Sequence, residues 1–184
     1  ESHAEAGDKA NDAVRVDGGQ VRARCVAEGG NLGFTQRGRI EYAQSGGRMN
    51  TDFIDNSAGV DTSDHEVNIK ILLAPEVASG KLTGQARDAL LASMTDEVAR
   101  LVLAHNFDQN LALANAMYRR TVLAGQHEAW MLTLEEDGLL DRALEALPTS
   151  AEMASRIAAG EGLTRPELAV LLSGARLQVT DPQT

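Results

Sequence analysis

The spacing of apolar residues along this 184-residue chain changes from one end to the other. Over residues 21–27 small and apolar side chains alternate with mostly Arg, which predicts a strand with one covered face. After a glycine-rich loop, Thr35 can cap a helix that Gly46 would end, and residues 49–54 predict a second strand. Strand, loop, helix and strand in this order predict a βαβ unit with parallel strands.

The second part of the chain has helical rather than strand-like spacing. Two start signals are specific: Thr149 to Glu152 and Thr164 to Glu167 both fit the S/T-x-x-E capping box. The stripe of Leu168, Leu171, Leu172 and Ala175 predicts a packed helix face. Helices are expected at about 84–105, 108–123, 127–136, 138–146, 150–159 and 165–178.

Composition places the change between the two parts near residue 74. Ten of the 17 glycines lie in residues 1–73, whereas the remainder is rich in Ala and Leu. The predicted fold is therefore α/β over residues 1–73, followed by an all-α domain over residues 74–184. Two strands alone do not make a stable sheet, so further strands would have to come from elsewhere.

Charge and apolar content limit the possible partners. A formal charge of −10 argues against binding to nucleic acid or to an anionic membrane surface. The apolar runs are much shorter than the ~20 residues that span a bilayer, and no signal peptide is visible at Glu1. We therefore expect a soluble, cytoplasmic protein in which the one cysteine, Cys25, is a small buried side chain.

The loop after the first predicted strand is a candidate nucleotide site. Gly29, Gly30 and Gly33 would let the backbone approach a ligand, and a helix N-terminus follows at Thr35. The dinucleotide fingerprint G-x-G-x-x-G is not met, because Glu28 stands at its first glycine. On glycine content alone, an ordinary tight turn is favoured over a nucleotide contact.

Metal and nucleophile motifs have less support. The segment from Asp55 to Glu66 has an acid at each end but Val60 where a calcium loop needs glycine. His65 has no second His or Cys at ligand spacing, so no zinc site is expected. Ser63 and His65 are too poorly spaced for a catalytic triad, and Gly80-Lys81 does not fit a P-loop.

Four stretches of the chain have a specific wording: residues 7–12 (GDKAND), 28–42 (EGGNLGFTQRGRIEY), 50–73 (from NTDFIDNSAGV to KILL) and 162–172 (GLTRPELAVLL). Together they resemble the large bacterial NAD-dependent glutamate dehydrogenases. The resemblance touches both halves of the chain. It implies an oxidoreductase that deaminates L-glutamate to 2-oxoglutarate and ammonia and passes hydride to NAD. It also implies that residues 1–73 are the C-terminal portion of a Rossmann-like, NAD-binding catalytic domain.

The resemblance assigns roles to individual residues. Gly29, Gly30 and Asn31 fit the loop E-G-A-N-G-P-T of the smaller glutamate dehydrogenases, in which the Asn lies near the nicotinamide, although Leu32 departs from it. Asn56 and Gly59 fit their N-A-G-G-V, whose Asn also approaches the nicotinamide.

Counting on from this motif, Ser63 falls on a Ser that binds the side-chain carboxylate of glutamate, and Glu66 falls on a family Glu. Asp64 and His65 replace an aromatic pair there. The alternative for Asn31 and Asn56 is that they only hold turns through their own backbone.

The resemblance also indicates what the chain lacks. The family's catalytic lysine and aspartate and its G-x-G-x-x-G belong upstream of Gly7, so we expect no catalytic residue here and no dehydrogenase activity from this polypeptide alone. The complete enzyme is expected to be a homo-oligomer. A different hypothesis is a non-catalytic module in which the helical part mediates subunit contacts.

Overall fold

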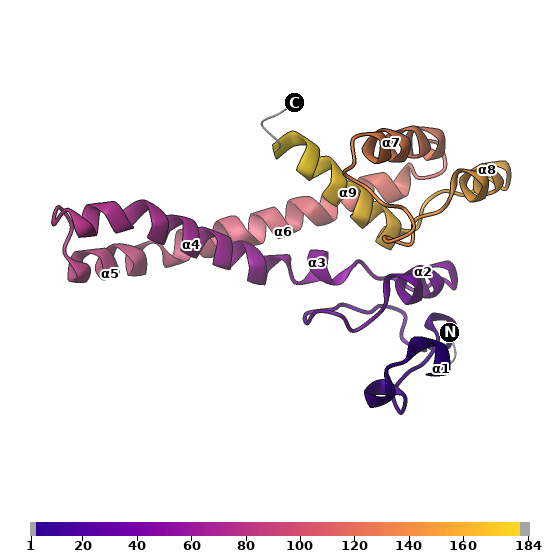
Figure 1. Ribbon diagram of the computed structural model, residues 1–184, viewed down its shortest axis with the longest axis horizontal. Coiled ribbons are helices and arrows are strands. Elements are labelled where there is room, and N and C mark those ends of the chain that lie inside the picture. Colours follow the sequence, from indigo (N-terminus) through magenta and orange to yellow (C-terminus); the bar gives the residue numbers. More distant parts are fainter. Residues whose placement is uncertain (1–2, 181–184) are drawn as a thin grey trace.

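The computed structural model describes residues 3–180, and the regular elements in this part of the chain are helical (Figure 1). Two 3-10 turns, η1 (Lys9–Asn11) and η2 (Gly18–Gln20), lie near the N-terminus. The α-helices are α1 (His3–Ala6), α2 (Gln36–Gln44), α3 (Asp52–Asp55), α4 (Ser57–Ala78), α5 (Gly84–Ser93), α6 (Thr95–Tyr118), α7 (Ala124–Glu136), α8 (Ser150–Ala158) and α9 (Arg165–Thr180).

The predicted α/β part is wrong, because residues 3–180 contain no β-sheet and hence no Rossmann-like βαβ remnant. The two segments expected as strands meet in a single parallel bridge between Cys25 and Arg48. It is held by hydrogen bonds from Val26 N to Arg48 O (2.9 Å) and from Arg48 N to Arg24 O (3.0 Å). No further strand pairs with this bridge in the described residues, and an isolated pair cannot propagate into a sheet. Cys25 is exposed rather than buried, so that expectation is also wrong.

Helices α4, α5 and α6 form an elongated arm (Figure 1). Gly80, with a left-handed φ of 74°, ends α4, and Thr83 then caps α5 by accepting a hydrogen bond from Ala86 N (3.1 Å). The chain returns along α5 and α6, so α4 packs against both. Helix α4 is continuous across residues 73 and 74, where the division between two domains was predicted, and that division stays a prediction.

The main hydrophobic core lies at the opposite end of α6, where α7, α8 and α9 gather around it (Figure 1). Helix α9 packs against α6 and α2, and α7 packs against α8. The predicted stripe of α9 is confirmed for Leu168 and Leu171, which are buried, and for Leu172, which packs against the core; the side chain of Ala175 lies outside the described residues. The other core residues are Ile54, Leu113, Ala124, Met131, Leu134, Leu147, Met153, Leu163, Ala169 and Val170.

Local start signals are confirmed. The Thr35 side chain accepts from Gly38 N (3.1 Å) at the start of α2, and the Thr149–Glu152 capping box opens α8. At α9, the carboxylate of Glu167 accepts from Thr164 N (2.6 Å). These caps fix where the helices begin because they satisfy N–H groups that have no partner within the helix.

The helix predicted at 138–146 is wrong, because this segment forms turns. Asp141 caps a turn by accepting from Leu144 N (3.0 Å), and Ala146 takes a left-handed φ of 53°. The buried Arg142 binds Glu128 and the carbonyl of Pro148. The helices predicted at 84–105 and 108–123 divide instead at Met94, after which α6 runs unbroken to Tyr118.

Among residues 3–180, none of the helices is both long enough and apolar enough to cross a membrane.

Candidate functional site

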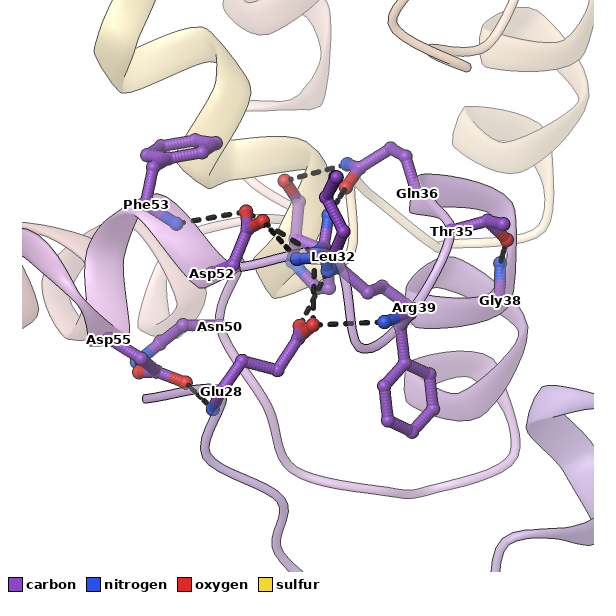
Figure 2. Close-up of polar contacts among 12 residues, drawn as sticks. Glu28, Leu32, Thr35, Gln36, Gly38, Arg39, Asn50, Asp52, Phe53 and Asp55 are labelled. Carbon is purple, nitrogen blue, oxygen red and sulfur yellow. Dashed lines mark hydrogen bonds and ion pairs between the residues drawn. The ribbon is translucent and has the colours of Figure 1, made fainter. Parts of the chain in front are cut away.

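The glycine-rich loop over residues 28–34 is held by a buried ion pair (Figure 2). The carboxylate of Glu28 accepts from Arg39 Nε (2.6 Å) and Nη2 (3.0 Å), and also from Phe34 N (3.0 Å) across the loop. Asp52 accepts from Leu32 N (3.0 Å) and lies 3.2 Å from Arg39 Nη2. Glu28 and Arg39 are 6% and 5% exposed. Two acids and one guanidinium thus fix a loop whose glycines alone would leave it mobile.

The charges of this cluster act on one another. Burial alone would lower the pKa of Arg39, but its hydrogen bond to Glu28 and the charges of Glu28 and Asp52 outweigh burial and raise that pKa above its ordinary value. Burial raises the pKa of Asp52, yet the hydrogen bond from Leu32 N and the charge of Arg39 together hold it below its ordinary value. Both groups are therefore charged at neutral pH.

The two asparagines proposed to border a cofactor meet at the start of α4. Asn56 Nδ2 donates to Asn31 Oδ1 over 3.1 Å, although the two residues are 25 positions apart. The sequence predicted each residue separately from a different motif, and the structure brings them together. Asn31 is exposed and Asn56 is half-buried, so the pair faces solvent.

Gly59 lies beside this pair. A Cβ at position 59 would stand 2.9 Å from Asn56 Oδ1, which is closer than ordinary van der Waals contact. Glycine at this position therefore leaves room for the Asn56 amide. Gly29 and Gly30, in contrast, have open space around them and are exposed, so no neighbour in the described residues requires glycine there.

Ser63 lies one turn beyond Gly59 on α4 and is exposed, with its hydroxyl donating to Gly59 O (3.3 Å). Positions 56, 59 and 63 follow helical spacing, so they share one face of the helix. Asn31, Asn56, Gly59 and Ser63 therefore line one side of the start of α4, and the N-terminus of this helix adds positive potential there.

A second polar cluster, not anticipated from the sequence, ties the site to the helical part. Asn50 Nδ2 donates to Asp55 Oδ1 (2.6 Å) and Asn110 Oδ1 (3.1 Å), and Asn50 Oδ1 accepts from Arg165 Nε. Asp55 also accepts from Glu28 N (2.8 Å) (Figure 2). Burial lowers the pKa of Arg165, against the opposing charge of Asp55. Because α6 and α9 supply two of these residues, only tertiary packing could reveal the cluster.

The sequence offered His65 no second ligand, but the structure brings His105 of α6 beside it. His105 Nδ1 lies 2.8 Å from Asp61 Oδ2, and His65 Nε2 lies 3.5 Å from Asp61 Oδ1. The two imidazoles stack with their centroids 5.9 Å apart. No local spacing signals this group, since His105 is 40 positions from His65.

Comparison with known proteins identifies the family. The sequence profile of the family described as "Bacterial NAD-glutamate dehydrogenase, catalytic domain" matches residues 1–116. The chain is 53% identical over 181 residues to the NAD-specific glutamate dehydrogenase of Pseudomonas aeruginosa, covering 98% of this chain and 11% of that protein. It is 52% identical over 177 residues to the protein of the same name from Mycobacterium tuberculosis, covering 96% of this chain and 11% of that protein.

The chain therefore belongs to the bacterial NAD-glutamate dehydrogenase family, as the resemblance of its sequence motifs predicted. It spans about 11% of the length of the curated relatives that it matches.

Proposed function

We propose that this chain forms one wall of the active site of an NAD-dependent glutamate dehydrogenase. The observation that carries the proposal is the hydrogen bond between Asn56 and Asn31, two residues that the resemblance to glutamate dehydrogenases, through two separate motifs, implies to lie near the nicotinamide. The relatives are named NAD-specific glutamate dehydrogenases, which supports NAD as the cofactor and glutamate, 2-oxoglutarate and ammonia as the reactants.

The asparagine pair suits a primary carboxamide. Each Asn side chain has two donor hydrogens and an acceptor oxygen, and the mutual bond uses one donor of Asn56 and one lone pair of Asn31. The remaining groups can donate to and accept from the carboxamide of nicotinamide. Gly29 and Gly30, which have open space around them, would allow a ligand to approach the loop backbone closely.

Ser63 completes the proposal on the substrate side. Its exposed hydroxyl can donate to the distal carboxylate of glutamate, one helical turn beyond Gly59. NAD supplies the hydride acceptor when it is bound, whereas the residues of this chain only hold cofactor and substrate in register. The Glu28–Arg39–Asp52 cluster keeps the loop in place behind Asn31.

The proposal gives this chain residues that bind and position the reactants, but none that transfers a proton. The 184-residue polypeptide alone should therefore show no glutamate-dependent formation of NADH. An activity assay of the pure chain tests this directly. Measurable turnover that scales with the concentration of the chain would contradict it.

The cofactor contact is tested by Asn56→Ala in the complete enzyme. We expect a tenfold or larger rise in the Michaelis constant for NAD or an equal fall in turnover. Asn68→Ala is the matched control, because Asn68 is exposed on the same helix, three turns further on. Equal kinetics for the two variants would rule out the contact.

A second candidate role, as a subunit contact, is favoured by exposed apolar side chains on the arm. Leu103, Phe107 and Leu111 are 68%, 65% and 48% exposed and share one face of α6, since they are four positions apart. Ile71 and Leu72 of α4 are 65% and 72% exposed. Such surfaces typically contact protein.

We propose that the exposed face of α6 formed by Leu103, Phe107 and Leu111 contributes to a homo-oligomer of the complete enzyme. Phe107→Glu should lower its molar mass in light scattering, and an unchanged mass would contradict the proposal. A cytoplasmic location likewise stays a prediction.

A further inference from the structure

The arm contains a group of metal-ligating side chains that the proposed reaction does not use. Asp61 and His65 come from α4, one turn apart, and His105 comes from α6, which packs against it. One ligand atom from each residue lies within 4.8 Å of both others. Among the described residues, Asp61, His65 and His105 are the one group of three or more His, Cys or acidic side chains close enough together to hold a metal ion.

The spacing of these atoms suits a tetrahedral ion. Nitrogen and oxygen ligands about 2.0–2.1 Å from zinc lie about 3.3 Å from one another. His105 Nδ1 lies 2.8 Å from Asp61 Oδ2 and His65 Nε2 lies 3.5 Å from Asp61 Oδ1, so each imidazole faces a different oxygen of one carboxylate at a separation near that value, and one ligand atom from each residue lies within 4.8 Å of the other two. Small side-chain rotations would therefore bring all three atoms to bonding distance.

One of the candidate ligand atoms is buried without a hydrogen bond. His65 Nε2 makes no hydrogen bond, and its contact with Asp61 Oδ1, at 3.5 Å, is long. A buried ring nitrogen without a hydrogen bond is costly, and an ion between the helices would satisfy it. This observation favours a bound metal over a group held only by the His105–Asp61 hydrogen bond.

The surroundings also suit a cation. Asp61 and His105 line a pocket with a volume of about 450 Å³, and Asp64 and Asp108 add negative charge to its wall. Three protein ligands leave a fourth position free for water or a small ligand. On α4, positions 61 and 65 lie well round the helix from the Asn56–Ser63 side, so this site is separate from the proposed cofactor wall.

We propose that Asp61, His65 and His105 bind one Zn²⁺ ion, which ties α4 to α6. Two imidazoles and one carboxylate suit zinc better than Mg²⁺ or Ca²⁺, which take oxygen ligands. The ion would hold the arm as a unit and leave one coordination position open to solvent.

Calorimetric titration of the metal-free 184-residue chain with zinc sulfate tests the proposal. We expect a single saturable site that a large excess of Mg²⁺ does not displace. His65→Gln, His105→Asn and Asp61→Asn should each weaken zinc binding tenfold or more. The matched control is His3→Asn, in which a histidine outside the arm is changed in the same way, and it should bind as the parent does.

Far-UV circular dichroism separates loss of ligand from loss of fold, and the three replaced side chains are only partly buried, so the variants should keep their helices. Zinc should also raise the melting temperature of the parent and of His3→Asn but not that of the three ligand variants. Absence of saturable binding by the parent would overturn the proposal. Equal affinity in all folded variants would also overturn it, because the ion would then lie elsewhere.

Discussion

The buried pair between Glu28 and Arg39 makes a quantitative prediction for Glu28→Gln. The substitution keeps the size of the side chain but removes its charge and sets an amide nitrogen against the donor nitrogens of Arg39. Breaking a buried ion pair typically costs about 3–5 kcal/mol. Asp52, 3.2 Å from Arg39 Nη2, still balances part of the buried charge of Arg39 in the variant. We therefore expect a loss of about 2–3 kcal/mol in the free energy of unfolding.

Urea denaturation followed by circular dichroism measures this loss. For a chain of this size it corresponds to a fall of about 4–12 °C in melting temperature. Hydrogen exchange gives a local reading, because the N–H of Phe34 is bonded to the Glu28 carboxylate and should exchange faster in the variant.

Glu66→Gln is the matched control. It also removes one carboxylate from one ion pair, with Lys70, but this pair is exposed on α4. Exposed pairs add little to stability, so the unfolding midpoint should stay as in the parent. If Glu28→Gln destabilises the chain no more than Glu66→Gln does, the role assigned to the buried pair is wrong.

Three further predictions concern acid stability, the cofactor wall and a helix cap. The pKa of Asp52 is lowered in the fold, so its contribution to the free energy of unfolding is present above its unfolded pKa and is lost as pH falls through the folded value. Asp52→Asn should therefore flatten the acid denaturation profile below about pH 4. An unchanged profile would contradict this linkage. Gly59→Ala in the complete enzyme should displace the Asn56 amide and so raise the Michaelis constant for NAD. The melting temperature should stay nearly unchanged, because alanine favours helix. Normal kinetics would count against a cofactor contact at Asn56. Thr35→Ala should cost about 1 kcal/mol of unfolding free energy through loss of the α2 cap, whereas Thr62→Ala, within α4, should not destabilise; equal urea midpoints for the two variants would refute the cap.

The sequence predicts correctly those features that residues close together in the chain determine by themselves. The caps at Thr35 and Thr149 were correct because a side chain three residues or fewer from the orphaned N–H groups satisfies them. The helix predicted at 138–146 was wrong, because Leu139 and Leu140 pack against the core from the irregular segment after α7, while Arg142 reaches across to Glu128. Helical spacing alone cannot show that competing contact.

The predicted strands failed for a related reason. Alternation over 21–27 describes a segment that could pair, but pairing needs neighbours, and in the described residues Cys25 and Arg48 meet in one bridge only. The segment from Asp55 to Glu66 has the acidic ends of a calcium loop, but most of it forms the start of α4.

The site shows the same limit. The motifs marked Asn31 and Asn56 one by one, but their contact depends on the loop being held by Glu28, Arg39 and Asp52. The pairing of His65 with His105 depends on how α4 packs on α6, which nothing near either residue encodes.

The central claim, that Asn31 and Asn56 border the nicotinamide, is tested most directly by a structure of the complete enzyme with NAD bound. We expect the carboxamide of the nicotinamide to lie within about 3.2 Å of the side-chain amide of Asn31 or Asn56. A nicotinamide ring bound elsewhere, with both asparagines facing solvent, would contradict it.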